Sequence, residues 1–183
     1  MKAIDRYLQK VRISKAKKFV HKNDSVLDIG SVDGVMFEAW KGYISKGIGV
    51  DPTLEEEIKK ENYILYPGYF PQACPKGETF NAITMLAVLE HIPSQEQENL
   101  AINCHAFLKP KGRLIITVPS PQVDLILEVL TKLRLIDGMS LEEHYGFEPK
   151  HTPQIFGEPR FKLIHQSHFQ FGLNNLFVFE KIG

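Results

Sequence analysis

The sequence predicts an α/β fold, in which helices cover both faces of a mostly parallel β-sheet. Strand-like and helix-like segments alternate five times between residues 25 and 133, which is the pattern of a parallel sheet with crossover helices. Two β-rich segments near the end, residues 161–171 and 176–181, are separated only by residues 172–175. A connection this short requires an antiparallel hairpin, so we expect one reversed strand in the otherwise parallel sheet.

The first half of the chain predicts an N-terminal helical segment, three strands and the helices between them. Apolar residues recur at helical spacing before residue 22, which indicates one or two short helices. The first strand stops at Gly30, where glycine permits a tight turn. Thr53 and Glu56 have the spacing of a capping box and predict a short acidic helix. The expected elements are helical segment 1–22, strand 25–30, helix 34–44, strand 48–51, the acidic helix from 53, and strand 63–66.

The second half continues the alternation up to the hairpin. A loop rich in proline and glycine spans residues 67–77. Ser94 and Gln97 again have capping-box spacing, and Ser120 followed by Pro121 is typical of a helix start. The expected elements are strand 80–89, helix 94–108, turn 109–112, strand 113–118, helix 120–133 and a short helix 152–156.

Composition favours a single soluble domain spanning residues 1–183. The hydrophobic fraction is 43%, the charged fraction is 24% and the formal net charge is zero, so charge alone gives no argument for a nucleic acid or membrane partner. Cys74 and Cys104 are too few for a disulfide framework and lack metal-ligand spacing, so we expect no metal site. We see neither a secretory leader nor an apolar stretch long enough to span a bilayer, and therefore expect a cytoplasmic protein.

Basic residues dominate the opening segment. Two interpretations remain open: a solvated helix face, or a basic lip that attracts an acidic substrate or an anionic lipid headgroup. The basic residues, opposed only by Asp5, are Lys2, Arg6, Lys10, Arg12, Lys15, Lys17, Lys18 and Lys22.

Three strand ends carry residues suited to a ligand, and in a parallel sheet ligands bind beyond the carboxyl ends of the strands. The first is residues 28–34, where Asp28 ends a strand and Gly30 and Gly34 follow. These glycines do not complete a dinucleotide-binding fingerprint, so a plain strand-to-helix turn remains an alternative. The second is Asp51, which could accept both hydroxyls of a ribose or favour a following helix N-terminus. The third is residues 80–93, an apolar strand that runs into Leu-Glu-His-Ile-Pro.

Together these segments resemble the class I S-adenosylmethionine-dependent methyltransferases, in a short bacterial-type form with the Leu-Glu-His-Ile segment. Residues 28–34 are similar to the glycine-rich first motif of that family, Gly49-Val50-Asp51 to its ribose-binding motif and residues 108–116 to its fifth-strand motif. The resemblance covers about residue 26 to the C-terminus. It implies a Rossmann-like methyltransferase fold with a seven-stranded sheet, one antiparallel strand and helices on both faces.

The resemblance also implies S-adenosylmethionine as cofactor and S-adenosylhomocysteine as product. It assigns the methionine end to the first motif, the ribose to Asp51, the adenine border to the loop after the third strand, and backbone contacts near the amine and sulfonium to the fourth strand. The implied cofactor-binding residues are Asp28, Gly30, Ser31, Gly34, Asp51, Pro52, Gly68, Tyr69, Phe70, Met85, Leu86, Ala87 and His91. Val32 stands where the family usually has glycine. Because a β-branched residue resists positive φ, the loop there should be more ordinary or lie back from the cofactor.

The expected function is methyl transfer to a small-molecule acceptor by in-line displacement. A general base is needed only for an acceptor that carries a proton, and His91, His144, Tyr145 and His151 are its candidates. A non-catalytic cofactor-binding module and a nicotinamide-dependent oxidoreductase remain as alternatives. The sequence leaves the acceptor and the oligomeric state open.

Overall fold

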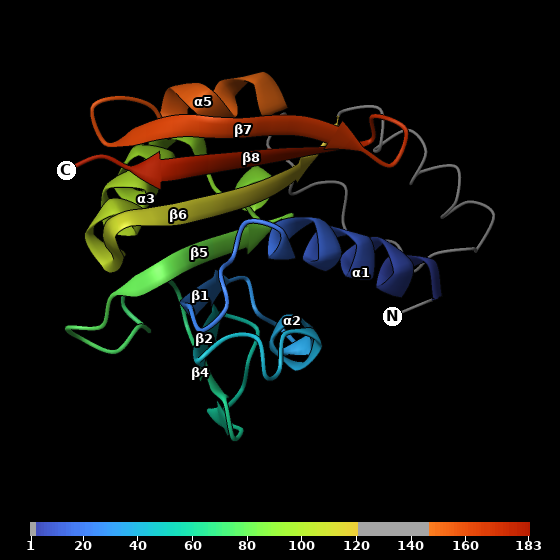
Figure 1. The fold of residues 1–183 in the computed structure, drawn as a ribbon, viewed down its shortest axis with the longest axis vertical. Coiled ribbons are helices and arrows are strands. Elements are labelled where there is room, and N and C mark those ends of the chain that lie inside the picture. Colours follow the sequence, from blue (N-terminus) through green and yellow to red (C-terminus); the bar gives the residue numbers. More distant parts are fainter. Residues whose placement is uncertain (1–2, 121–146) are drawn as a thin grey trace.

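The computed structural model describes residues 3–120 and 147–183 (Figure 1). Within these residues lies an eight-stranded sheet in the order β3-β4-β2-β1-β5-β6-β8-β7. The strands are β1 Ser25–Ile29, β2 Lys46–Asp51, β3 Ile58–Lys59, β4 Tyr63–Pro67, β5 Phe80–Leu86, β6 Leu108–Pro119, β7 Phe161–Phe169 and β8 Asn174–Lys181. The helices are α1 Ala3–Lys17, α2 Val35–Ala39, η1 Leu89–His91, α3 Ser94–Phe107, η3 Pro149–His151 and α5 Thr152–Ile155.

The strand directions confirm the predicted mixed sheet. Neighbouring strands from β4 through β2, β1 and β5 to β6 run parallel, and β8 runs antiparallel to β6 and pairs with β7 in a hairpin. The predicted count of seven strands lacks β3, a two-residue strand that lies antiparallel to β4 at the edge of the sheet. The reversed β8 is the feature that separates this topology from an all-parallel nucleotide-binding sheet.

The predicted acidic helix from residue 53 is wrong. Both the backbone N–H and the hydroxyl of Thr53 donate to Oδ1 of Asp51, at 2.8 and 2.5 Å. The Thr53 side chain is therefore bonded to the preceding turn and does not cap a following helix. The chain continues through bends into β3.

Several predicted boundaries also move. Helix α2 ends at Ala39 and not at residue 44, and β5 ends at Leu86 because Ala87 takes a positive φ of 62° and the chain turns into η1. The predicted turn 109–112 lies within the irregular start of β6. At the start of α3, the Gln97 side chain donates to the Ile92 carbonyl at 2.9 Å in place of the expected capping box. The predicted helix 120–133 lies almost entirely outside the described residues.

Each face of the sheet is buried by its own set of helices. Helices α1 and α2 pack on one face, with Ile13, Ala16, Phe37 and Trp40 among the buried residues. Helices α3 and α5 pack on the other. Because side chains alternate along a strand, Val26 and Asp28 of β1 face α1 and α2, while Leu27 and Ile29 face the opposite core. None of the helices among residues 3–120 and 147–183 has the length and apolar character needed to cross a bilayer.

Candidate functional site

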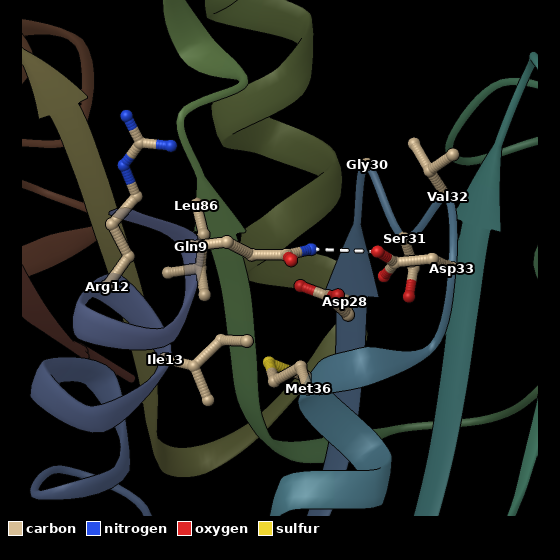
Figure 2. A pocket seen from close by; sticks show the side chains of 10 residues that line it. All are labelled: Gln9, Arg12, Ile13, Asp28, Gly30, Ser31, Val32, Asp33, Met36 and Leu86. Atoms are coloured by element: carbon tan, nitrogen blue, oxygen red, sulfur yellow. Dashed lines mark hydrogen bonds between the residues drawn. The ribbon is translucent and has the colours of Figure 1, made fainter. Parts of the chain in front are cut away.

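A pocket lies where α1 covers the end of β1 and the loop that leads to α2 (Figure 2). Its cavity volume is about 80 Å³. The residues that line it are Gln9, Arg12, Ile13, Asp28, Gly30, Ser31, Val32, Asp33, Met36 and Leu86. The pocket therefore gathers the first predicted strand end, one residue of the third, and a helix that contributes no predicted site residue.

Asp28 is the buried acid of this pocket. Its side chain is 6% exposed, and Oδ1 accepts a hydrogen bond of 2.6 Å from the Thr84 hydroxyl on neighbouring β5. Burial raises the pKa of Asp28 to about 7, against the opposing effects of hydrogen bonds from Thr84 and Ser31, and the charges of Asp33 and Asp51 raise it further. A carboxyl group with such a pKa gains from a cation placed beside it.

The loop after β1 turns back onto β2. The backbone N–H groups of Gly30 and Ser31 both donate to the Val50 carbonyl, at 2.9 and 3.2 Å. Gly30 takes a φ of 86°, and a Cβ at this position would lie 2.3 Å from Cγ2 of Val88. Glycine is thus required here by backbone conformation and by the contact with Val88.

Two further residues of this loop, Ser31 and Val32, also line the pocket. Ser31 is 3% exposed, and its hydroxyl lies close enough to Asp28 to lower the pKa of that carboxyl group. Val32 avoids positive φ, as expected for a β-branched residue, and its side chain is 56% exposed beside the pocket. The expectation of a more ordinary loop at Val32 is confirmed.

Helix α1 closes the pocket from the side, and the sequence interpretation misses its role. Nε2 of Gln9 donates to Oδ2 of Asp33 at 3.0 Å, which ties the helix to the glycine loop (Figure 2). Nε of Arg12 donates to Oδ1 of Asn174 at the start of β8, at 3.3 Å. The only sequence feature that pointed to this helix was the basic character of residues 1–22. That feature does not show which of the basic side chains lines the pocket.

Asp51 ends β2, directly beside β1 in the sheet, but it does not line this pocket. Its side chain is 5% exposed and its Oδ1 accepts the two bonds from Thr53. Its backbone carbonyl accepts a hydrogen bond of 3.0 Å from the N–H of Gly68, whose φ is 122°. The second and first predicted acids are therefore neighbours at one edge of the sheet, and Asp51 is bound into a turn with Thr53.

The remaining predicted cofactor residues have varied surroundings. Pro52 is exposed, Tyr69 is 73% exposed, and the Phe70 ring packs edge-on against Phe107 at 5.3 Å. Met85 is fully buried in the core, so that only its backbone could face a ligand. The other four residues lie at the ends of elements. Gly34, with a φ of 66°, is the N-cap of α2, and Leu86 ends β5 and lines the pocket. Ala87 donates its N–H to the Thr117 carbonyl, and His91 ends η1.

The candidate bases are dispersed. His91 is half-buried at the end of η1, and His151 is exposed at the end of η3. His144 and Tyr145 lie outside the described residues. Neither of these two histidines is among the residues that line the pocket.

A family model described as a methyltransferase domain matches residues 2–168. The chain therefore belongs to the methyltransferase domain family, and its fold is that of the class I methyltransferases. No curated protein matches the sequence.

Solved structures share the fold at low sequence identity. The N-methyltransferase NodS from Bradyrhizobium japonicum superposes with a TM-score of 0.66 at 12% identity, covering 98% of this chain and 99% of NodS. A candidate S-adenosylmethionine-dependent methyltransferase from Listeria monocytogenes gives 0.67 at 13% identity, covering 94% and 98%. A candidate methyltransferase from Haloferax volcanii, solved in complex with its Trm112 activator, gives 0.69 at 12% identity, covering 100% and 99%.

Proposed function

We propose that this chain uses S-adenosylmethionine to methylate a small-molecule acceptor. The observation that carries the proposal is the buried Asp28 at the pocket, with the buried Ser31 hydroxyl beside it. An acid whose pKa is raised by burial is stabilised in its ionised form by a cation placed beside it. The ammonium group at the methionine end of the cofactor would supply that cation.

The residues of the chain have separate roles in this proposal. Asp28 and Ser31 hold the amino-acid end, and the loop through Gly30 brings the backbone close to it. Asp51 accepts the ribose hydroxyls through Oδ2, because Oδ1 already accepts from Thr53. Residues Gly68, Tyr69 and Phe70 border the adenine, and the exposed Tyr69 ring is available for stacking.

The bound cofactor supplies a methyl group that its sulfonium has already activated. The main task of the protein is then to orient the acceptor in line with that methyl group and to exclude water. A base at His91, His144, Tyr145 or His151 is needed only if the acceptor loses a proton during transfer.

Calorimetry with S-adenosylmethionine, S-adenosylhomocysteine and NAD tests the proposal. We expect both sulfur ligands to bind and NAD not to bind. Binding of NAD alone would overturn the proposal, although the antiparallel β8 and the incomplete glycine fingerprint already speak against an oxidoreductase. Turnover is then measured as formation of S-adenosylhomocysteine with a panel of small acceptors.

A second candidate is a binding module that holds the cofactor without catalysis. The observation that favours it is that neither described candidate base lines the pocket, since His91 lies in η1 and His151 in η3. Tight binding without turnover across nitrogen, oxygen, sulfur and carbon acceptors would support this candidate.

A further inference from the structure

The outer face of α1 is basic and takes no part in the pocket. Residues 6–22 contain seven lysines and arginines and no aspartate or glutamate, in a chain whose formal net charge is zero. Positive charge is therefore concentrated on one helix and the short segment after it. Near the beginning of this helix Arg6, Tyr7 and Lys10 are all exposed. Their spacing of three and four residues from Lys10 places them on one side of the helix.

The two cations at the start of α1 face outward without a counter-charge from the protein. Arg6 and Lys10 are one helical turn apart, where like charges repel each other. No hydrogen bond or ion pair within residues 3–120 and 147–183 involves either side chain. Tyr7 lies between them and is 64% exposed. This arrangement does not stabilise the helix, and it suits an external partner of negative charge.

A fully exposed aromatic side chain lies at the turn between β7 and β8. Phe171 and the preceding Gln170 have φ values of 57° and 51°, a left-handed conformation that costs free energy in residues other than glycine. Hydrogen bonds hold this turn in place. The N–H of Leu173 donates to the Gln170 carbonyl at 3.1 Å, and the Ser120 hydroxyl donates to the Gly172 carbonyl at 2.7 Å. The turn is thus fixed in a conformation that exposes the Phe171 ring.

The hairpin and α1 contact each other directly. Nζ of Lys15 lies 5.8 Å from the centre of the Phe169 ring at the end of β7, and Nε of Arg12 donates to Asn174 at the start of β8. In Figure 1 the beginning of α1 and the β7–β8 turn both lie at the end of the molecule toward which the parallel strands point. The docking surface consists of the exposed residues at this end, Arg6, Tyr7, Lys10 and Phe171.

Exposed acidic residues are concentrated at the other side of the sheet. Glu55, Glu56, Glu57 and Glu61 are exposed in the segment between β2 and β4. This segment contains β3, which forms one edge of the sheet, whereas β7 forms the opposite edge. Charge is therefore separated across the width of the sheet. An anionic surface would attract the docking surface and repel the acidic edge, which fixes the orientation of the protein.

We propose that the docking surface binds an anionic lipid bilayer, with Arg6 and Lys10 against the headgroups and the Phe171 ring in the interface. Exposed cations without a fixed partner suit a diffuse negative surface, which attracts each of them without requiring one geometry. A single aromatic ring on a turn suits a soft apolar layer, and tyrosine is favoured where apolar and polar layers meet. Docking turns the pocket end of the sheet toward the bilayer and does not depend on the proposed function.

Co-sedimentation with lipid vesicles tests the proposal. We expect the unaltered chain to bind vesicles of phosphatidylcholine and phosphatidylglycerol in equal parts, to bind much less to phosphatidylcholine alone, and to be released by salt. Arg6→Gln combined with Lys10→Gln should weaken binding about thirty-fold, because each cation near such a surface contributes about five-fold. Lys59→Gln combined with Lys60→Gln is the matched control. It removes two exposed cations at the β3 edge and should change binding less than about two-fold.

Two substitutions at Phe171 test contact of the hairpin turn with the bilayer. Phe171→Ala should weaken binding about ten-fold, because the ring no longer leaves water on docking. Phe171→Trp should retain binding, and its fluorescence should shift to shorter wavelength when anionic vesicles are added. Trp40 is the only tryptophan of the unaltered chain and is buried, so the emission of the unaltered chain should stay constant.

Several outcomes would overturn the proposal. These are absence of binding to the anionic vesicles, equal weakening in the Lys59 and Lys60 control, and an unshifted emission of bound Phe171→Trp. Self-association without vesicle binding, abolished by the Arg6 and Lys10 substitutions, would instead assign the surface to a second copy of the chain. All of these outcomes leave S-adenosylmethionine binding, and with it the proposed function, unaffected.

Discussion

The Thr84 hydroxyl and the Asp28 carboxyl group lie 2.6 Å apart on neighbouring parallel strands, and both side chains are buried. When Asp28 is ionised, Thr84 donates to it. When Asp28 is protonated, the acid can donate to Thr84, whose hydroxyl is also within reach of the Leu27 carbonyl at 3.3 Å. The pair therefore accommodates both protonation states, and the balance between them bears directly on how a cationic ligand binds.

Thr84→Val tests this relationship. Valine keeps the shape of threonine but cannot donate, so the ionised form of Asp28 loses its hydrogen bond and the pKa of Asp28 rises further. We expect the acidic limb of the pH profile for S-adenosylhomocysteine binding to shift upward by about one pH unit, the equivalent of a hydrogen bond to a charged group. Calorimetry between pH 5.5 and 8.5, as assay conditions, measures the limb.

Thr84→Ser is the matched control, because serine retains the hydroxyl. Its pH profile should coincide with that of the unaltered chain. 5′-Methylthioadenosine, which lacks the ammonium group, should show no acidic limb in any of these proteins. A Thr84→Val profile that overlays the unaltered one would dissociate Asp28 from ammonium binding.

Asp28→Asn should stabilise the unliganded protein above neutral pH. The unfolded chain ionises Asp28 near pH 3.8, whereas the folded chain retains the proton up to about pH 7. Between these values the unfolded state binds fewer protons, so the free energy of unfolding falls as pH rises, by at most about 4 kcal/mol, and remains lowered above pH 7. Asparagine has no such dependence and should also bind S-adenosylhomocysteine more weakly.

Urea unfolding from pH 4 to 8, read as the midpoint and the slope, measures this difference. The difference in the free energy of unfolding between Asp28→Asn and the unaltered chain should increase from pH 4 to about pH 7 and remain constant at higher pH. Glu55→Gln, a change at an exposed carboxyl group, should leave the profile unchanged. Parallel profiles for Asp28→Asn and the unaltered chain would show that Asp28 is not protonated on folding.

Hydrophobic patterning was sufficient to predict most of the fold. The strands that build the centre of the sheet are continuous apolar runs, and the short hairpin connection forces β8 to reverse. Elements that depend on which hydrogen bond a single side chain forms were predicted less well. Thr53 could cap a helix or bond back to Asp51, and the local sequence is compatible with both until the turn is formed.

The strand-end residues of the site were predictable, but the residues that complete it were not. Asp28, Gly30 and Ser31 follow a recognisable strand and precede a helix, so their position at the sheet edge follows from the topology. Gln9 and Arg12 reach the pocket only because α1 packs across the sheet, and this contact joins segments distant in sequence. The positive charge of the opening segment indicates a basic surface. It does not show that Arg12 lines the pocket whereas Lys10 is exposed.

Asp51→Asn should weaken every adenosine-containing ligand. The asparagine oxygen can still accept from Thr53, so the turn is preserved, while the charged acceptor for the ribose is lost. We expect a loss of roughly 1.5–3 kcal/mol for S-adenosylhomocysteine and for 5′-methylthioadenosine alike, the scale of hydrogen bonds to a charged group.

Calorimetry with both ligands checks the Asp51 prediction, and Thr53→Val serves as the control within the same turn. That variant removes one donor to Asp51 and leaves the carboxylate, so its ligand affinity should be close to that of the unaltered chain. Unchanged affinity in Asp51→Asn would contradict the proposal that Asp51 binds the ribose. Its hydrogen bonds with Thr53 in the turn would then be its only assigned role.

The two cysteines should be unreactive in the folded protein. Burial raises the pKa of Cys74 to about 12 and raises that of Cys104 as well, so neither forms the thiolate that attacks disulfide reagents. We expect no reaction with 5,5′-dithiobis(2-nitrobenzoic acid) at pH 8 without denaturant, and reaction of both thiols in urea. Rapid reaction of one thiol in native buffer would show that its cover opens locally.

Gly30→Ala should destabilise the fold for two separable reasons. The residue has a φ of 86°, which disfavours any side chain, and an added Cβ would lie 2.3 Å from Cγ2 of Val88. We expect the free energy of unfolding to fall by about 2–4 kcal/mol, the sum of a left-handed conformation and an overpacked contact. Urea unfolding at one pH measures the loss.

A double-mutant cycle with Val88→Ala separates the two reasons. Removing both Val88 methyl groups makes room for the new Cβ, so the double variant should lose less stability than the sum of the single variants. Gly77→Ala isolates the backbone contribution, because Gly77 has a φ of 79° and nothing within 4 Å of an added Cβ. Additive losses at Gly30 and Val88, with Gly77→Ala as costly as Gly30→Ala, would leave the backbone conformation as the sole reason. A coupled loss would instead show that glycine at the start of the loop is needed to seat Val88 of the fourth-strand segment, before any ligand is bound.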